Sequence, residues 1–110
     1  MNVMDAIQFH DKIVDEVMRK TYDPEIPVNI YELGLIYEIK VDPETDMVNV
    51  KMTLTSPGCP AAGTLPGEVE DKIRRLGTGV IKDVKIEITW EPPWEPSKMT
   101  EAARLQLGMF

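Results

Sequence analysis

The sequence predicts an α+β fold with two layers, in the order α-β-β-α-β, in which two helices cover one face of a small mixed sheet. Two observations indicate this class. Apolar residues recur at helical spacing in two segments, 5–20 and 65–76. They alternate with polar residues in three others, 35–41, 48–55 and 84–90, as expected for strands with one buried face.

Size and charge limit the function. We expect one domain spanning 1–96 and a tail, 97–110, that contains a short helix. The net charge of −7 disfavours binding to nucleic acid and to anionic membranes. Because no segment has the apolar length of a membrane span or the pattern of a signal peptide, we expect the protein in the cytoplasm.

The first helix is predicted from its capping residues. Asp5 is a suitable N-cap, with Gln8 three positions on, and Met4 is expected to pack on Phe9 as a hydrophobic staple. The only histidine, His10, falls within this helix. Prolines within 24–27 then exclude a helix.

Two strands follow as a β-hairpin. The turn residues at 42–46 separate two alternating runs. The expected buried positions are Leu35, Tyr37, Ile39 and Val41 in the first strand, and Val48, Val50, Met52 and Leu54 in the second.

The second helix has two candidate starts. A start at Cys59 and Pro60 would expose the cysteine to the helix dipole, but Pro66 would then break an early turn. We therefore favour a start near Pro66, with Gly77 as the C-terminal cap. A third strand running parallel to the second would complete a crossover connection, which the handedness rule predicts to be right-handed.

A Pro/Trp-rich segment, 90–96, leads into the tail and is expected to be extended. Thr100 is expected to cap a short helix that runs through Leu107 and ends at Gly108. Large apolar side chains are frequent here for a terminus, and we expect them to pack on protein, most simply in a homodimer. They are Met99, Leu105, Leu107, Met109 and Phe110.

The single cysteine, Cys59, lies where an alternating run gives way to a turn and then a helix. Gly58 and Pro60 flank it, and the proline restricts its backbone. One cysteine cannot form an internal disulfide, in agreement with a reducing compartment. From the residue alone, Cys59 is either a small buried hydrophobe or a reactive thiolate.

Three segments together resemble the PaaD/SufT-like family of iron-sulfur cluster assembly proteins: Asp-Pro-Glu-Ile-Pro through Leu-Gly-Leu-Ile-Tyr at 23–37, Thr-Leu-Thr-Ser-Pro-Gly-Cys-Pro at 53–60, and Trp-Glu-Pro-Pro-Trp at 90–94. The resemblance implies a cytosolic maturation factor that works with iron-sulfur assembly proteins and client apo-proteins. It places the family's reactive cysteine at Cys59. It also implies site neighbours at Asp23, Glu25, Thr53, Thr55, Ser56 and Gly58.

Ligand number limits how a cluster could be held. Coordination of a cluster normally requires about four ligands, mostly thiolates, and one chain offers one. A homodimer supplies two, and the others would come from glutathione, a carboxylate, His10 or a partner protein. Any iron-sulfur cluster is therefore expected to be transient or shared between chains. The sequence predicts a non-enzymatic factor that uses Cys59 to handle metal or cluster.

Two alternatives remain open at this stage. The protein could be an accessory subunit or scaffold of the oxygenase-assembly type, with Trp90 and Trp94 contacting partners and an incidental Cys59. It could instead be a small thiol enzyme, which would need His10 as its base. Each candidate also has a structural interpretation: turn formation for Asp23 and Glu25, strand propensity on a polar face for the threonines, and packing for the tryptophans.

Overall fold

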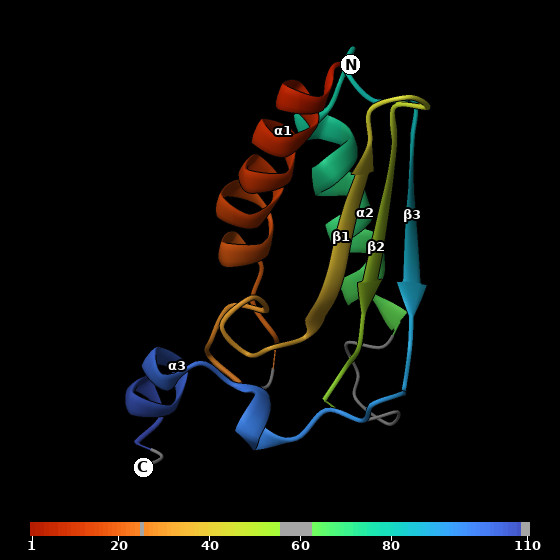
Figure 1. Ribbon diagram of the computed structural model, residues 1–110. Coiled ribbons are helices and arrows are strands. Elements are labelled where there is room, and N and C mark those ends of the chain that lie inside the picture. Colours follow the sequence, from red (N-terminus) through yellow and green to blue (C-terminus); the bar gives the residue numbers. More distant parts are fainter. Residues whose placement is uncertain (25, 56–62, 109–110) are drawn as a thin grey trace.

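The computed structural model describes residues 1–24, 26–55 and 63–108. It contains a three-stranded sheet in the order β1-β2-β3 (Figure 1). β1 and β2 are antiparallel, whereas β2 and β3 are parallel, so the predicted mixed sheet is confirmed. The strands are β1 (Ile36–Asp42), β2 (Met47–Met52) and β3 (Asp83–Ile88).

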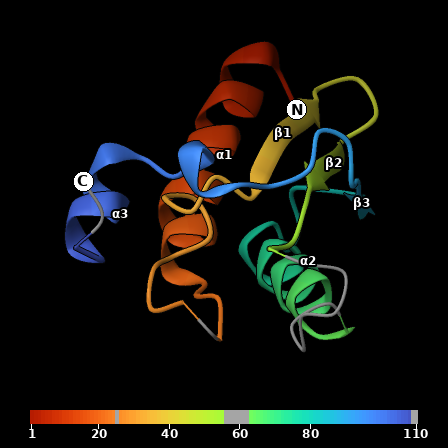
Figure 2. The ribbon, with the colours of Figure 1, turned by 90° about the horizontal axis from the view of Figure 1, so that it is seen from below.

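The two long helices lie on one side of this sheet. Seen along the sheet in Figure 2, α1 lies beside β1 and α2 packs against β3. The helices are α1 (Val3–Glu16), α2 (Leu65–Leu76) and α3 (Glu101–Gln106), and single 3₁₀ turns occur at η1 (Met18–Lys20) and η3 (Pro96–Lys98). No helix in the described part of the chain is long and apolar enough to cross a membrane.

The core lies between the sheet and the two long helices. Val48, Val50 and Met52 of β2 are buried, as their alternation predicts. The expected alternation in β1 holds for Ile39 and Val41, which pair with Val50 and Val48 and pack on the core.

The predicted burial of Tyr37 on the core is wrong, because a bulge between Ile36 and Glu38 changes the phase of β1. Ile36 packs on the core instead. The Tyr37 hydroxyl donates a hydrogen bond to the Pro92 carbonyl at 2.7 Å.

The start of α1 differs from the prediction. The side chain of Asn2 caps the helix, accepting a hydrogen bond from the Asp5 amide at 2.7 Å. Asp5 therefore lies in the first turn. Asparagine and aspartate cap about equally well, so the earlier residue takes the position. Met4 is 64% exposed, and the predicted staple to Phe9 is absent.

The later start of the second helix is confirmed. α2 begins at Leu65 with Pro66 in its first turn, and it ends at Gly77, whose amide donates to the Ile73 carbonyl at 2.9 Å. The effect of a helix dipole fades within about one turn. The predicted weak effect of this dipole on Cys59 lies outside the described residues.

The tail packs on its own domain. Thr100 caps α3, accepting a hydrogen bond from the Ala103 amide at 3.2 Å, as predicted. Met99 and Ala103 are buried in the main core and Leu107 packs against it, whereas Leu105 is exposed. The predicted apolar contacts of Met109 and Phe110 lie outside the described residues.

Candidate functional site

The chain that carries Cys59 leaves the sheet at the end of β2, and this end is held on both sides. The Thr53 amide donates to the Leu35 carbonyl at 2.8 Å. On the other side, the Thr89 amide donates to the Met52 carbonyl at 2.9 Å. The two hydrogen bonds join the end of β2 to the turn before β1 and to the chain after β3, which fixes the point where the cysteine segment begins.

Buried leucines bracket the cysteine segment. Leu54 precedes it and Leu65 follows it, and both side chains belong to the main core. Cys59, Glu25, Ser56 and Gly58 lie outside the described residues. Of the predicted site residues, Asp23, Thr53, Thr55, Trp90 and Trp94 are described.

Thr53 lies at the first of these boundaries and is fully buried. Its predicted position on a polar strand face is wrong, because Leu35 and Tyr37 lie against it. Its hydroxyl has no hydrogen-bond partner with good geometry among the described residues. Burial raises the pKa of the Tyr37 phenol, the adjacent Thr53 hydroxyl opposes this shift, and the Glu95 carboxylate adds to it. Thr55 is half-buried.

The side chain of Asp23 stabilises a turn. Its side chain is buried at 3% exposure, and Oδ1 accepts a hydrogen bond from the Ile26 amide at 3.1 Å. Figure 1 shows this loop toward the same end of the molecule as the end of β2. The turn interpretation therefore holds for Asp23, and the loop that carries it lies toward the end of the fold where the cysteine segment begins.

Lys72 of α2 helps to hold this loop. Its ammonium group donates to the Thr21 hydroxyl at 3.0 Å, and that hydroxyl donates to the Val17 carbonyl at 2.7 Å. Thr21 is itself fully buried. These bonds connect the second helix to the start of the Asp23 loop.

The tail crosses the turn that supports the site. The Trp94 indole nitrogen donates to the Leu33 carbonyl at 2.7 Å. Gly34 has φ of +80°, and a Cβ there would lie 2.2 Å from the Lys98 carbonyl oxygen, so only glycine fits. Trp94 is half-buried against the core, while Trp90 is 41% exposed. A role in partner binding stays a prediction for both, and Trp90 is the more accessible.

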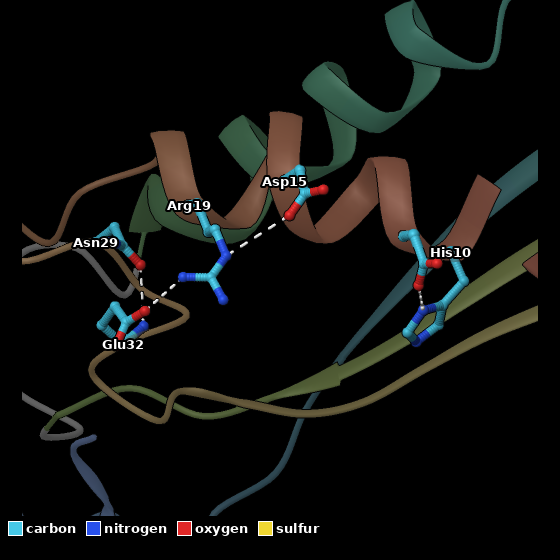
Figure 3. Close-up of polar contacts among 6 residues, drawn as sticks. His10, Asp15, Arg19, Asn29 and Glu32 are labelled. Atoms are coloured by element: carbon cyan, nitrogen blue, oxygen red, sulfur yellow. Dashed lines mark hydrogen bonds and ion pairs between the residues drawn. The ribbon is translucent and has the colours of Figure 1, made fainter. Parts of the chain in front are cut away.

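His10 lies away from this end of the fold. It borders a groove of about 370 Å³ between α1 and the far end of β1, together with Val41 and Pro43. Its Nδ1 lies 3.3 Å from Asp11 Oδ1. Figure 3 shows His10 on the helix, apart from the ion pairs at the other end of α1.

Those ion pairs were not predicted from the sequence. Arg19 pairs with Glu32 and, at 3.7 Å, with Asp15, and the Asn29 side chain accepts a hydrogen bond from the Glu32 amide (Figure 3). Glu32 also accepts a hydrogen bond from the Thr100 hydroxyl. The Thr100 bond, followed by Arg19, lowers the pKa of Glu32. The partners are 13 and 68 positions from Glu32 in the sequence, so no local pattern could show them.

The described residues offer no metal site of their own. Nowhere in 1–24, 26–55 or 63–108 do three or more histidine, cysteine, aspartate or glutamate side chains group in a way that could hold a metal ion. What these residues supply is a fixed end of β2, a buried carboxylate in the neighbouring loop and a fixed start of α2.

The fold is shared with a family of iron-sulfur cluster assembly proteins. Residues 11–88 match the family model described as iron-sulfur cluster assembly protein, and the chain belongs to this PaaD/SufT-like family. The structure of a domain of unknown function, DUF59, from Bacillus anthracis superimposes with a TM-score of 0.83 at 31% identity, covering 99% of this chain and 100% of that one.

Individual relatives carry more specific names. An Fe-S protein maturation auxiliary factor from Porphyromonas gingivalis is 45% identical over 104 residues, which is 94% of this chain and 95% of the relative. The Fe-S protein maturation auxiliary factor SufT from Staphylococcus aureus is 37% identical over 87 residues, or 79% of this chain and 96% of the relative.

Proposed function

We propose that this protein is a cytoplasmic, non-enzymatic maturation factor for iron-sulfur proteins, and that Cys59 binds iron or a cluster transiently and passes it to client apo-proteins. The observation that carries the proposal is the position of the only cysteine. It lies within the segment matched by the family model, between two boundaries that the core holds in place. The maturation-factor names of the relatives support the same role.

The chemistry of the proposal follows from ligand type. A thiolate is a soft ligand that suits iron in clusters, and it binds after losing its proton. Carboxylates at Asp23 and Glu25 are candidates to complete or screen the site, because the loop of Asp23 lies toward the end of the fold where β2 ends. A single thiolate holds a cluster weakly, which favours transfer over storage.

Anaerobic reconstitution tests the proposal. The protein is incubated with ferrous iron and sulfide, and then with an apo-ferredoxin, and bound iron is followed by absorbance and native mass. We expect the wild type to bind iron or cluster and transfer it, and Cys59→Ser to do neither while keeping its thermal stability. Equal loading and transfer by Cys59→Ser would favour the scaffold interpretation.

The same samples address the thiol-enzyme alternative. A cysteine nucleophile needs a base within hydrogen-bond reach. His10 borders the groove beside Val41 and Pro43, at the hairpin end of β1, whereas β2 meets the cysteine segment at its other end. We therefore expect His10→Ala to load and transfer like the wild type. A loss as large as that of Cys59→Ser would return the Cys-His pair to consideration.

A further inference from the structure

β3 is an edge strand whose outer side has no neighbouring strand in the described part of the chain (Figure 1). The other edge strand, β1, is flanked by α1 in both views (Figures 1 and 2). An uncovered edge presents N-H and C=O groups that can pair with another strand. The two edges of the sheet therefore differ, and β3 is the accessible one.

The hydrogen bonds of β3 identify the groups that point outward. The amide and carbonyl of one residue point to the same side of a strand, and successive residues alternate. Thr89 donates inward to Met52, so Lys85 and Glu87 also face β2. Ile86 and Ile88 therefore direct their amides and carbonyls away from the sheet.

The outward groups of Val84 are already capped. Its amide donates to Asp83 Oδ1 at 2.9 Å, and its carbonyl accepts from Arg74 Nη2 at 3.3 Å. Arg74 and Asp83 are themselves joined at 2.7 Å. This ion pair closes the first part of the edge, and the open part is centred on Ile86 and Ile88.

We propose that a second copy of this chain pairs with this edge, antiparallel and centred on Ile86, to form a two-fold symmetric dimer. The charges of Lys85 and Glu87 favour one register of this pairing. With Ile86 opposite its own copy, Lys85 lies opposite the partner subunit's Glu87, and the same pair recurs across the axis. Opposite charges at facing positions stabilise strand pairing, and like charges oppose it.

Neighbouring registers fail this test. The outward amides and carbonyls of the two strands can pair only in registers that differ from this one by steps of two residues. The reason is that successive residues of a strand direct these groups to opposite sides. A shift one way places Lys85 opposite the partner subunit's Lys85, and a shift the other way places Glu87 opposite the partner subunit's Glu87. Both side chains are exposed on the open face of the sheet. Glu87 also lies 3.7 Å from Lys51 Nζ, but an exposed ion pair of this kind contributes little to stability, so Glu87 can still pair with the partner.

The side chains of β3 that face the helices are also consistent with this dimer. Ile86 and Ile88 turn their side chains toward the core but remain partly exposed, since no strand lies beyond them. Pairing covers this apolar rim with the same residues of the partner. The interface is isologous, the type found in two-fold dimers.

Charge exchange tests the dimer. Sedimentation equilibrium is measured for the wild type, Lys85→Glu, Glu87→Lys and an equimolar mixture of the two variants. We expect each variant alone to weaken dimerisation about tenfold, because two attractive pairs become repulsive. The mixture should recover the wild-type dissociation constant, since every facing pair in the mixed dimer joins opposite charges.

A matched control shows whether dimerisation depends on the facing charge pairs or only on the net charge of the protein. Lys40→Glu makes the same change on an exposed residue of β1, on the same face of the sheet, and should leave dimerisation unchanged. A wild type that stays monomeric at its highest soluble concentration would overturn the proposal. A mixture no tighter than its components, or an equal effect of Lys40→Glu, would overturn it as well.

Hydrogen exchange gives a readout that does not depend on the variants. The Ile86 amide points outward and should exchange more slowly as the concentration of wild-type protein rises. The Lys85 amide faces β2 and should show no such dependence. Concentration-independent exchange at Ile86 would contradict pairing at this edge.

Discussion

The Trp94 indole nitrogen donates a hydrogen bond of 2.7 Å to the Leu33 carbonyl, 61 positions earlier in the sequence. Two residues beyond Leu33, the Leu35 carbonyl accepts the Thr53 amide that fixes the end of β2. The tail and the cysteine segment are therefore connected through one short turn. We therefore expect changes in the tail to alter the structure at the candidate site.

The first prediction concerns this bond. Trp94→Phe keeps an aromatic ring but removes the donor and leaves the Leu33 carbonyl without it. We expect the free energy of unfolding to fall by about 1 kcal/mol, the usual contribution of one hydrogen bond. Urea unfolding gives the value. Trp90→Phe, at a more exposed position, is the control and should change it by less than about 0.5 kcal/mol. Equal effects would show that the bond contributes nothing.

Local chemistry made much of the fold predictable. Alternation located β2 and β3, and Pro66 correctly excluded an early start for α2, because a proline fits only the first helical turn. The N-cap of α1 was predicted at the wrong residue, because Asn2 and Asp5 are equally suitable as caps chemically. The bulge beside Tyr37 has no signature in the sequence of β1 alone.

The candidate site was predictable only in part. The residue pattern located the Asp23 turn. It placed the end of the second strand too late, because the predicted strand ran to Thr55 and β2 ends at Met52. It could not show that Thr53 is buried, because the neighbours found for it, Leu35 and Tyr37, belong to a distant part of the sequence. The attachment of the tail through Glu32 and Thr100 depends equally on contacts between distant segments.

The second prediction concerns acid stability. The Thr100 hydrogen bond and Arg19 hold the pKa of Glu32 below its ordinary value of 4.5. The unfolded chain therefore binds the proton more readily, and this stabilisation is present above pH 4.5 and lost as pH falls through the folded pKa. We expect Glu32→Gln to be less stable than the wild type at neutral pH, with the difference shrinking in acid.

Thermal unfolding between about pH 3 and 7 measures this difference. Glu16→Gln, an exposed change at the end of α1, is the matched control and should follow the wild type. A difference between Glu32→Gln and the wild type that stays constant over this range would show that the charge of Glu32 is not what stabilises the fold.

The third prediction concerns the end of the chain. A protein ending at Pro96 loses the buried side chains of Met99 and Ala103. Removing a buried methionine side chain alone typically costs about 2–5 kcal/mol. We expect lower stability together with lost solubility or a changed oligomeric state, measured by thermal unfolding and light scattering. A chain ending at Gly108 is the control. An equally stable, monodisperse short form would show that the tail is dispensable.

The fourth prediction is that Cys59 is accessible in the folded protein, since a ligand that delivers metal has to meet its client. Maleimide should label the native wild type at a rate comparable to that in denaturant. Cys59→Ser provides the blank. Labelling that requires denaturant would remove the main support for delivery and favour the scaffold interpretation.

The central claim is that the protein works through the sulfur of Cys59, and one measurement tests it most directly. Cells lacking the protein are supplied with wild type or Cys59→Ser at equal abundance, and the activities of their iron-sulfur enzymes are assayed. Serine nearly preserves the volume of cysteine but lacks its soft ligand. We predict a folded variant that leaves these activities at the level of the deletion. Full restoration by Cys59→Ser would contradict the account.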